Sequence, residues 1–122
     1  MSSLLSLLLA AGVAAIGPLH ATFAAPGHTP KTNTRWNYVV RAVRDGKPVA
    51  AKLTAQIVDP IGGRHPVVFD ATKRPITKWP FNGTFRDYII WPSSSRGVPL
   101  TLKLVVSSGR SATVIRYVVT PR

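Results

Sequence analysis

The stretch LTLKLVVSSGRSATVIRYVV, from Leu100 to Val119, decides the fold class of this chain. Apolar side chains occupy alternate positions from Leu100 to Val106, and a second alternation runs from Thr113 to Val119. A period of two is typical of β-strands, in which successive side chains point to opposite faces. Ser108-Gly109 separates the two runs and predicts a turn. The stretch therefore predicts two antiparallel strands joined in a hairpin.

The same two-residue period recurs upstream. One alternation with an aromatic face runs from Trp36 to Val43, and a longer one with a polar outer face runs from Val49 to Ile57. Asp45-Gly46 between them predicts a tight hairpin turn, because both residues adopt positive φ at low cost. Thr84–Trp91 carries apolar side chains on both faces, which indicates a central strand or a strand covered by a loop. No stretch from residue 35 onward shows a helical period over ten residues.

Six or seven short strands separated by turns are typical of two packed antiparallel sheets. We therefore predict that residues 35–122 form one all-β domain, an immunoglobulin-like sandwich. Asp45–Thr54 (DGKPVAAKLT) resembles the G-x-P-V-x-x-A-x-V opening of bacterial extracytoplasmic immunoglobulin-like and fibronectin type III-like modules. The hairpin from Pro99 to Val119 is similar to the last two strands of such modules. The chain lacks the Cys–Trp–Cys core of antibody domains. The resemblance implies a fold, and it implies a role in adhesion, spacing or envelope binding.

Residues 1–24 resemble a secretory signal peptide. Leu4–Ala11 is its apolar segment, and Thr22-Phe23-Ala24 places small residues before a cleavage after Ala24. Residues 25–34 have the composition of a flexible linker, so we expect an extracytoplasmic protein, secreted or attached to the cell surface. No Lys or Arg precedes the apolar segment. Either translation starts further upstream, or the segment is retained as an anchor or assembly helix.

Composition narrows the class of partner. The chain of 122 residues has no cysteine, which excludes disulfides and thiolate metal sites and favours a bacterial envelope or secreted domain. Its 16 Lys and Arg against 4 acidic residues give a net charge of +12. This excess favours association with anionic polymers or lipids. The longest basic run is only Lys73-Arg74, so an evenly cationic surface and a dedicated polyanion site both stay open.

We expect no enzymatic activity, no cofactor and no bound metal. From residue 35 onward the sequence holds only one histidine, His65, so a nucleophile would have few general bases to choose from. Asp45 and Asp59 lie in predicted turns, which explains both residues. Asp87 lies within a predicted strand, where we expect it to pair with a Lys or Arg. Closely spaced acids for calcium and Met-His clusters for copper are absent.

Thr72–Phe81 is the main candidate for partner binding. It interleaves the cations Lys73, Arg74 and Lys78 with the aromatic residues Trp79 and Phe81 in an irregular, proline-containing segment. Cations beside a flat aromatic ring can hold a glycan phosphate or a nucleic-acid backbone with a stacked ring. In the alternative interpretation, the aromatic rings close the end of the sandwich while the cations stay solvated. Trp91 and Arg96 flank a Ser-rich loop and form a second candidate, with core packing as the alternative for Trp91.

Two hypotheses follow for function. In the first, the chain is a secreted or cell-surface, non-catalytic sandwich module that binds a protein or an anionic envelope polymer. In the alternative, it is a structural subunit whose apolar N-terminus is retained and packs into an oligomer or filament. We expect membrane contact only through the N-terminal segment. We do not expect a nucleic-acid partner, because the charge is scattered and an export segment precedes the domain.

Overall fold

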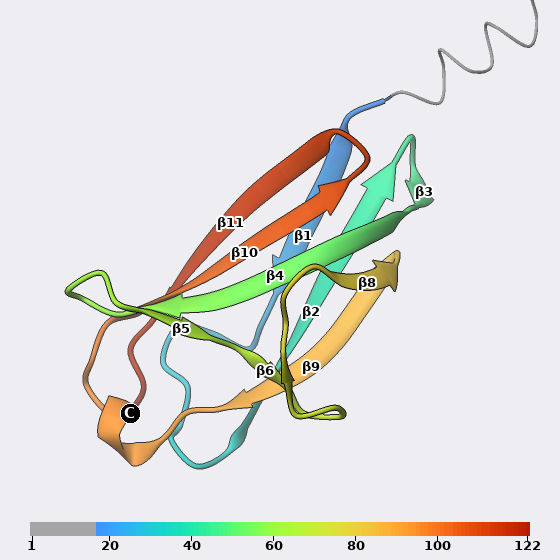
Figure 1. Cartoon of the computed structure of the whole chain (residues 1–122). Helices are drawn as coiled ribbons and strands as arrows, with labels where there is room; N and C mark the ends of the chain where they lie inside the picture. Colours follow the sequence, from blue (N-terminus) through green and yellow to red (C-terminus); the bar gives the residue numbers. More distant parts are fainter. Residues whose placement is uncertain (1–16) are drawn as a thin grey trace, which may run out of the picture.

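The computed structural model describes residues 17–122, and these residues consist almost entirely of strands and turns, as the sequence predicts. The seven strands of four or more residues are β1 (Leu19–Ala24), β2 (Arg35–Arg44), β4 (Ala50–Val58), β8 (Trp79–Asn82), β9 (Thr84–Ile90), β10 (Leu100–Ser108) and β11 (Ser111–Val119). The short ones are β3 (Lys47–Pro48), β5 (Arg64–Pro66), β6 (Val68–Phe69) and β7 (Arg74–Pro75), and a short 3-10 helix spans Ser93–Ser95. The start of β1 and the C-terminus lie at opposite ends of the long axis (Figure 1).

The strands form two main antiparallel sheets. The first has the order β1-β2-β9, and β3 pairs with the end of β2. The second has the order β11-β10-β4-β5, and β8 also pairs with β4. The predicted hairpin from residue 100 to 119 is β10–β11, in which Leu100 lies opposite Val119. The strands β6 and β7 form a separate small hairpin.

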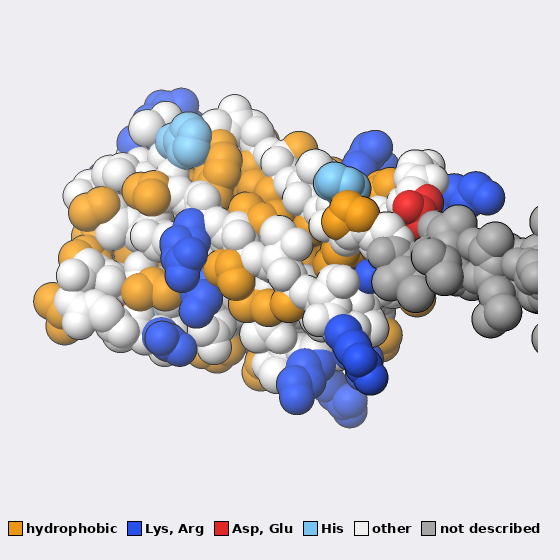
Figure 2. Space-filling view, turned by 90° about the horizontal axis from the view of Figure 1, so that it is seen from above, with side chains coloured by type: hydrophobic (Ala, Val, Ile, Leu, Met, Phe, Trp, Pro, Cys, Tyr) orange, Lys and Arg blue, Asp and Glu red, His pale blue; other side chains and the backbone are white. Residues whose placement is uncertain are grey.

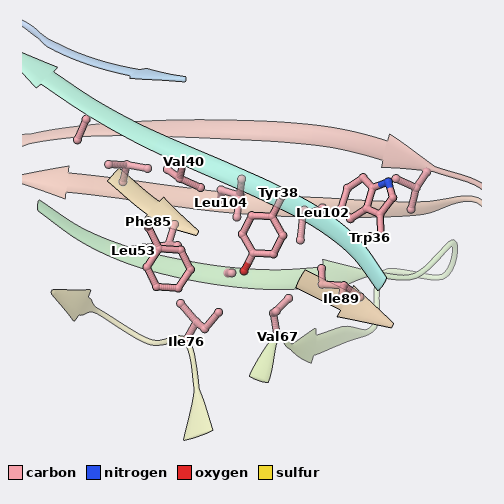
Figure 3. Packing of buried hydrophobic residues seen from close by; sticks show 14 of the residues in the cluster. Trp36, Tyr38, Val40, Leu53, Val67, Ile76, Phe85, Ile89, Leu102 and Leu104 are labelled. Atoms are coloured by element: carbon pink, nitrogen blue, oxygen red, sulfur yellow. The ribbon is translucent and has the colours of Figure 1, made fainter. Parts of the chain in front are cut away.

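The core lies between the inner faces of the two sheets. Figure 3 shows Trp36, Tyr38 and Val40 of β2 facing Leu53 of β4 and Leu102 and Leu104 of β10. All six side chains are buried, and they are the apolar positions of the predicted alternations. Burial of this apolar surface is the main favourable term for a two-layer fold, and in a chain without disulfides it must suffice.

Strand β9 is not the central strand that its two apolar faces allow. It pairs with β2 alone, and Ile90 is 51% exposed. Its buried residue Phe85 contacts Phe69 of the β6–β7 hairpin, with ring centroids 5.1 Å apart. A neighbouring segment therefore covers Phe85 on one apolar face of β9, whereas the other face stays open to solvent at Ile90.

Glycine is required at the crossing from β8 to β9, where the chain passes from one sheet to the other. Gly83 has φ +75° and is buried, and a Cβ there would lie 2.6 Å from Cβ of Pro48. Its N–H donates to the Val49 carbonyl at 3.0 Å, and its own carbonyl accepts from the Ala42 N–H at 2.9 Å. Gly83 therefore locks the end of the β2–β3 hairpin to the β8–β9 crossing. The hairpin itself turns at Asp45-Gly46 as predicted, with φ of 53° and 74°.

The domain begins before residue 35, because the end of the predicted signal peptide forms a strand of the first sheet. Strand β1 pairs with β2 from Leu19 opposite Arg44 to Ala24 opposite Val39. Leu19 is buried, and Phe23 packs its ring against Tyr117 of β11 with centroids 4.9 Å apart. The strand alternates apolar inner residues with exposed ones, but within a long apolar stretch that period is hidden.

Residues 25–34 are not a flexible linker, because they pair with the C-terminal tail. The N–H of Thr32 donates to the Arg122 carbonyl at 2.9 Å, and the N–H of Arg122 donates to the Pro30 carbonyl at 2.9 Å. The His28 ring stacks on Tyr117 with centroids 4.1 Å apart. These partners are about 90 residues away along the chain, so composition alone does not predict them.

The predicted apolar segment Leu4–Ala11 lies outside the described residues. Within residues 17–122, no helix is long and apolar enough to cross a membrane.

We predict that Gly83→Ala lowers the free energy of unfolding by roughly 3 kcal/mol or more, measured by urea denaturation. The new side chain meets both an unfavourable positive φ and a clash with Pro48. Gly109→Ala is the matched control, because Gly109 has φ +60° with nothing within 4 Å of its Cβ position. We expect the control to cost about 1–2 kcal/mol. Equal losses for the two variants would contradict the tight approach at Pro48.

Candidate cationic groove

The candidate segment 72–81 is divided between two parts of the fold. Lys73 and Arg74 lie on the β6–β7 hairpin beside β9. Lys78, Trp79 and Phe81 lie on or just before β8, which pairs with β4 of the second sheet. The five residues therefore do not lie on one loop, although Trp79 packs on Phe69 of the β6–β7 hairpin.

The three cations differ in their surroundings. Lys73 donates from Nζ to Oδ1 of Asp70 at 2.7 Å, and this hydrogen bond raises the pKa of Lys73. Arg74 is exposed at the end of the hairpin. Lys78 is exposed with φ +47°, and its backbone N–H donates to Oγ1 of Thr54 at 3.0 Å. Its ammonium group is thus available, whereas that of Lys73 already has a carboxylate partner.

The aromatic residues turn toward the core, as the alternative interpretation expects. Trp79 packs edge-on against Phe69 with centroids 5.1 Å apart, and Phe81 packs edge-on against Phe85 at 6.0 Å. Both Trp79 and Phe81 are partly buried. Their rings extend the core at the edge of the sandwich, so they offer no open stacking platform.

Of the second candidate pair, Trp91 belongs to the core. Trp91 is only 1% exposed and packs against Trp36 with centroids 5.6 Å apart, so its ring is not available to a partner. Its Nε1 is buried without a hydrogen-bond acceptor among the described residues. Arg96 is exposed and donates from Nη2 to Oγ1 of Thr32 at 3.0 Å. This bond ties the Ser-rich loop to the segment 25–34 and gives Arg96 a local role.

A groove crosses the outer side of the second sheet, where β10, β4 and β8 lie next to each other. Its volume is about 610 Å³, and its lining is Ala50, Ala51, Lys52, Lys78, Pro80, Phe81, Ser107, Ser108 and Gly109. Lys52 lies on the central strand, opposite Ser107 on one side and Pro80 on the other. We call this feature the Lys52–Lys78 groove.

The two lysines are placed on the same side of the sheet by ordinary strand geometry. Lys52 and Thr54 are two residues apart on β4, so their side chains share one face. The backbone of Lys78 is fixed to that face by its hydrogen bond to Thr54. The groove lining contains two cations and no acid, so its electrostatic preference is for an anion.

Sequence reasoning found Lys78 and Phe81 but missed Lys52, Ser107 and Ser108. Lys52 alternates with apolar residues along a regular strand, which is also the pattern of an ordinary solvated face. Only the pairing of β4 with both β8 and β10 brings these residues together. That pairing joins positions far apart in the sequence.

A second hollow is lined by residues of β2 and β9 and by residues 69–71. It has a volume of about 440 Å³ and contains Asp70, Asp87, Tyr38 and Tyr88 among its lining residues. The Tyr38 hydroxyl donates to Oδ2 of Asp87 at 3.4 Å. The prediction that Asp87 pairs with a Lys or Arg is wrong, because no cation of the described residues lies within salt-bridge distance of its carboxylate.

The pKa values of the two carboxyl groups in this hollow are shifted in opposite directions. Burial raises the pKa of Asp87 above its ordinary value, although backbone hydrogen bonds from Tyr88 and Asp70 act against this. The pKa of Asp70 is lowered, first by the hydrogen bond from Lys73 and then by that from Tyr88. Burial also raises the pKa of Tyr38, so this hydroxyl stays protonated.

Most of the positive charge is unpaired. Across residues 17–122, which include every Lys, Arg and Asp of the chain, Lys73 alone of the Lys and Arg residues forms a salt bridge. Lys and Arg side chains recur over the face shown in Figure 2, interspersed with hydrophobic side chains. In the same part of the chain, no group of three or more His, Asp or Glu side chains is close enough to hold a metal ion.

Comparison with known proteins gives one distant structural similarity. No family model matches this chain, and no curated protein matches it. A DUF4466 family protein from Parabacteroides merdae ATCC 43184 has a crystal structure that aligns with 88% of this chain and 44% of its own chain. The TM-score is 0.46 and the sequence identity is 14%. The present chain thus spans less than half the length of that protein.

The opposite pKa shifts of Asp70 and Asp87 predict that the free energy of unfolding depends on pH. Because the pKa of Asp87 is raised by folding, its ionised form disfavours the fold at neutral pH. We expect Asp87→Asn to be more stable than the wild type at pH 7, with the difference shrinking as the pH falls through the folded pKa of Asp87. Urea denaturation between pH 7 and pH 3 measures this.

Asp70→Asn is the matched control with the opposite sign. The pKa of Asp70 is lowered by folding, so its contribution is present at neutral pH and is lost as the pH falls through its folded pKa. We expect this variant to be less stable than the wild type at pH 7 and equal to it at low pH. If both variants shift stability in the same direction at pH 7, the assigned environments are wrong.

Proposed function

We propose that this chain is a non-catalytic, immunoglobulin-like binding module of a bacterial envelope, which holds an anionic polymer in the Lys52–Lys78 groove. The supporting observations are the order of the strands, the unpaired positive charge and the composition of the groove. The groove carries the proposal, because it joins two lysines and no acid on a concave surface.

The order of the strands supports the immunoglobulin-like assignment. Immunoglobulin domains place strands A, B and E in one sheet and C, F and G in the other. Here β1, β2 and β9 form one sheet in the order 1-2-9, and β4, β10 and β11 form the other in the order 11-10-4. In chain order these six strands take the positions A, B, C, E, F and G. The short strand β5 lengthens the second sheet beyond β4.

The charge distribution supports an anionic partner. A net charge of +12 with a single Lys–Asp pair leaves nearly every cation free to attract counter-ions. A polymer that replaces these counter-ions gains their release entropy, so binding weakens as salt rises. The groove volume of about 610 Å³ lies in the range of small-ligand sites. It suits a short segment of a phosphate-bearing polymer.

The resemblance of the N-terminal segment to a signal peptide supports the envelope assignment. The apolar segment Leu4–Ala11 resembles the core of a signal peptide, and the chain holds no cysteine. A domain that depends on sheet packing alone tolerates an environment outside the cytoplasm without oxidative folding.

A binding series with teichoic acid tests the groove. The full chain is titrated at several salt concentrations, and log K is plotted against log salt. We expect Lys52→Ser with Lys78→Ser to weaken binding and to reduce the slope by about two, roughly one per lysine. Both side chains are exposed, so the fold should be unaffected.

Lys73→Ser with Arg74→Ser is the matched control, because it removes the same charge from the β6–β7 hairpin. We expect a smaller change in slope, since Lys73 is already paired with Asp70. Equal losses for the two double variants would show a dispersed interaction without a groove. Unchanged binding by the groove variant would overturn the proposed site, and binding that is equally strong to neutral dextran would overturn the polyanion assignment.

A further inference from the structure

Strand β1 conflicts with cleavage after Ala24. That cut would remove Leu19–Ala24, which is the whole of β1. The edge of β2 from Val39 to Arg44 would then lose its partner strand. Unpaired backbone groups and an uncovered apolar edge both cost stability.

The inner side chains of β1 belong to the core. Leu19 is only 9% exposed. The ring of Phe23 lies 5.8 Å from that of Tyr38, 6.1 Å from that of Trp36 and 4.9 Å from that of Tyr117, so it contacts both sheets. Removal of Phe23 would open the side of the sandwich where β1 and β11 lie next to each other.

Contacts with the rest of the domain begin at Gly17, two residues before β1. The carbonyl of Gly17 accepts a hydrogen bond from Nε of Arg44 at 2.9 Å. The same guanidinium donates from Nη2 to the Ser108 carbonyl at 3.2 Å and to Oγ of Ser111 at 3.3 Å. Arg44 thus fastens the entry of β1 to the β10–β11 turn. A side chain at position 17 would also clash with the carboxylate of Asp45.

From this geometry we infer that processing of the exported chain occurs upstream of β1 and leaves Leu19–Ala24 in the mature protein. This inference rests on the exported module proposed above.

N-terminal sequencing of the full chain, produced in a secretion-competent bacterium and recovered from outside the cytoplasm, tests the inference. We expect a processed mature protein that starts at Pro18 or earlier and therefore retains β1. A start at Leu19 or later, Ala25 above all, overturns it, and so does an unprocessed chain. Failure of teichoic acid binding would not change this result, whereas a chain that stays in the cytoplasm would overturn export itself.

Two variants of the full chain provide a second readout. Phe23→Ala is expected to lower the urea midpoint of the exported protein, because Phe23 is part of its core. Thr22→Ala on the exposed side of β1 is the control and is expected to leave the midpoint unchanged. If the two exported variants unfold at the same urea concentration as the wild type, β1 is absent from the mature protein and the inference fails.

Discussion

The contact between the inner face of β2 and the inner faces of β4 and β10 is the interaction on which this structure depends. Val40 is fully buried in the first sheet, as are Leu53 and Leu104 in the second. Because no disulfide holds the sheets together, their separation must be set by side-chain packing. The strands that line the groove and the crossing at Gly83 belong to the two sheets that this packing holds together.

Regular alternation made much of the fold predictable. The β10–β11 hairpin and the turn at Asp45-Gly46 depend on local periodicity and local backbone preferences, which a sequence displays directly. The pairing of Thr32 with Arg122 and the packing of Phe23 on Tyr117 depend on residues brought together only by the complete sandwich. Strand β1 was hidden for a related reason, because an apolar stretch predicts a leader more readily than a six-residue strand.

The candidate site was predictable only in part. A segment rich in cations and aromatic residues pointed to β8, and Lys78 does line the groove. The same pattern could not separate rings that face a partner from rings that face the core. Trp79 and Trp91 belong to the second kind, whereas Phe81 packs on Phe85 and also lines the groove. Lys52 could not be predicted, because its place in the groove depends on the strands β8 and β10 that pair with β4. Local composition does not indicate strand order.

The placement of the start of β1 and of the C-terminus has a mechanical consequence. The start of β1 and the C-terminus lie at opposite ends of the long axis (Figure 1). Tension between them runs along β1, whose hydrogen bonds to β2 lie across the strand direction. Such bonds are strained together rather than opened one at a time. A module tethered at one end and pulled at the other would therefore resist extension through the whole β1–β2 ladder at once.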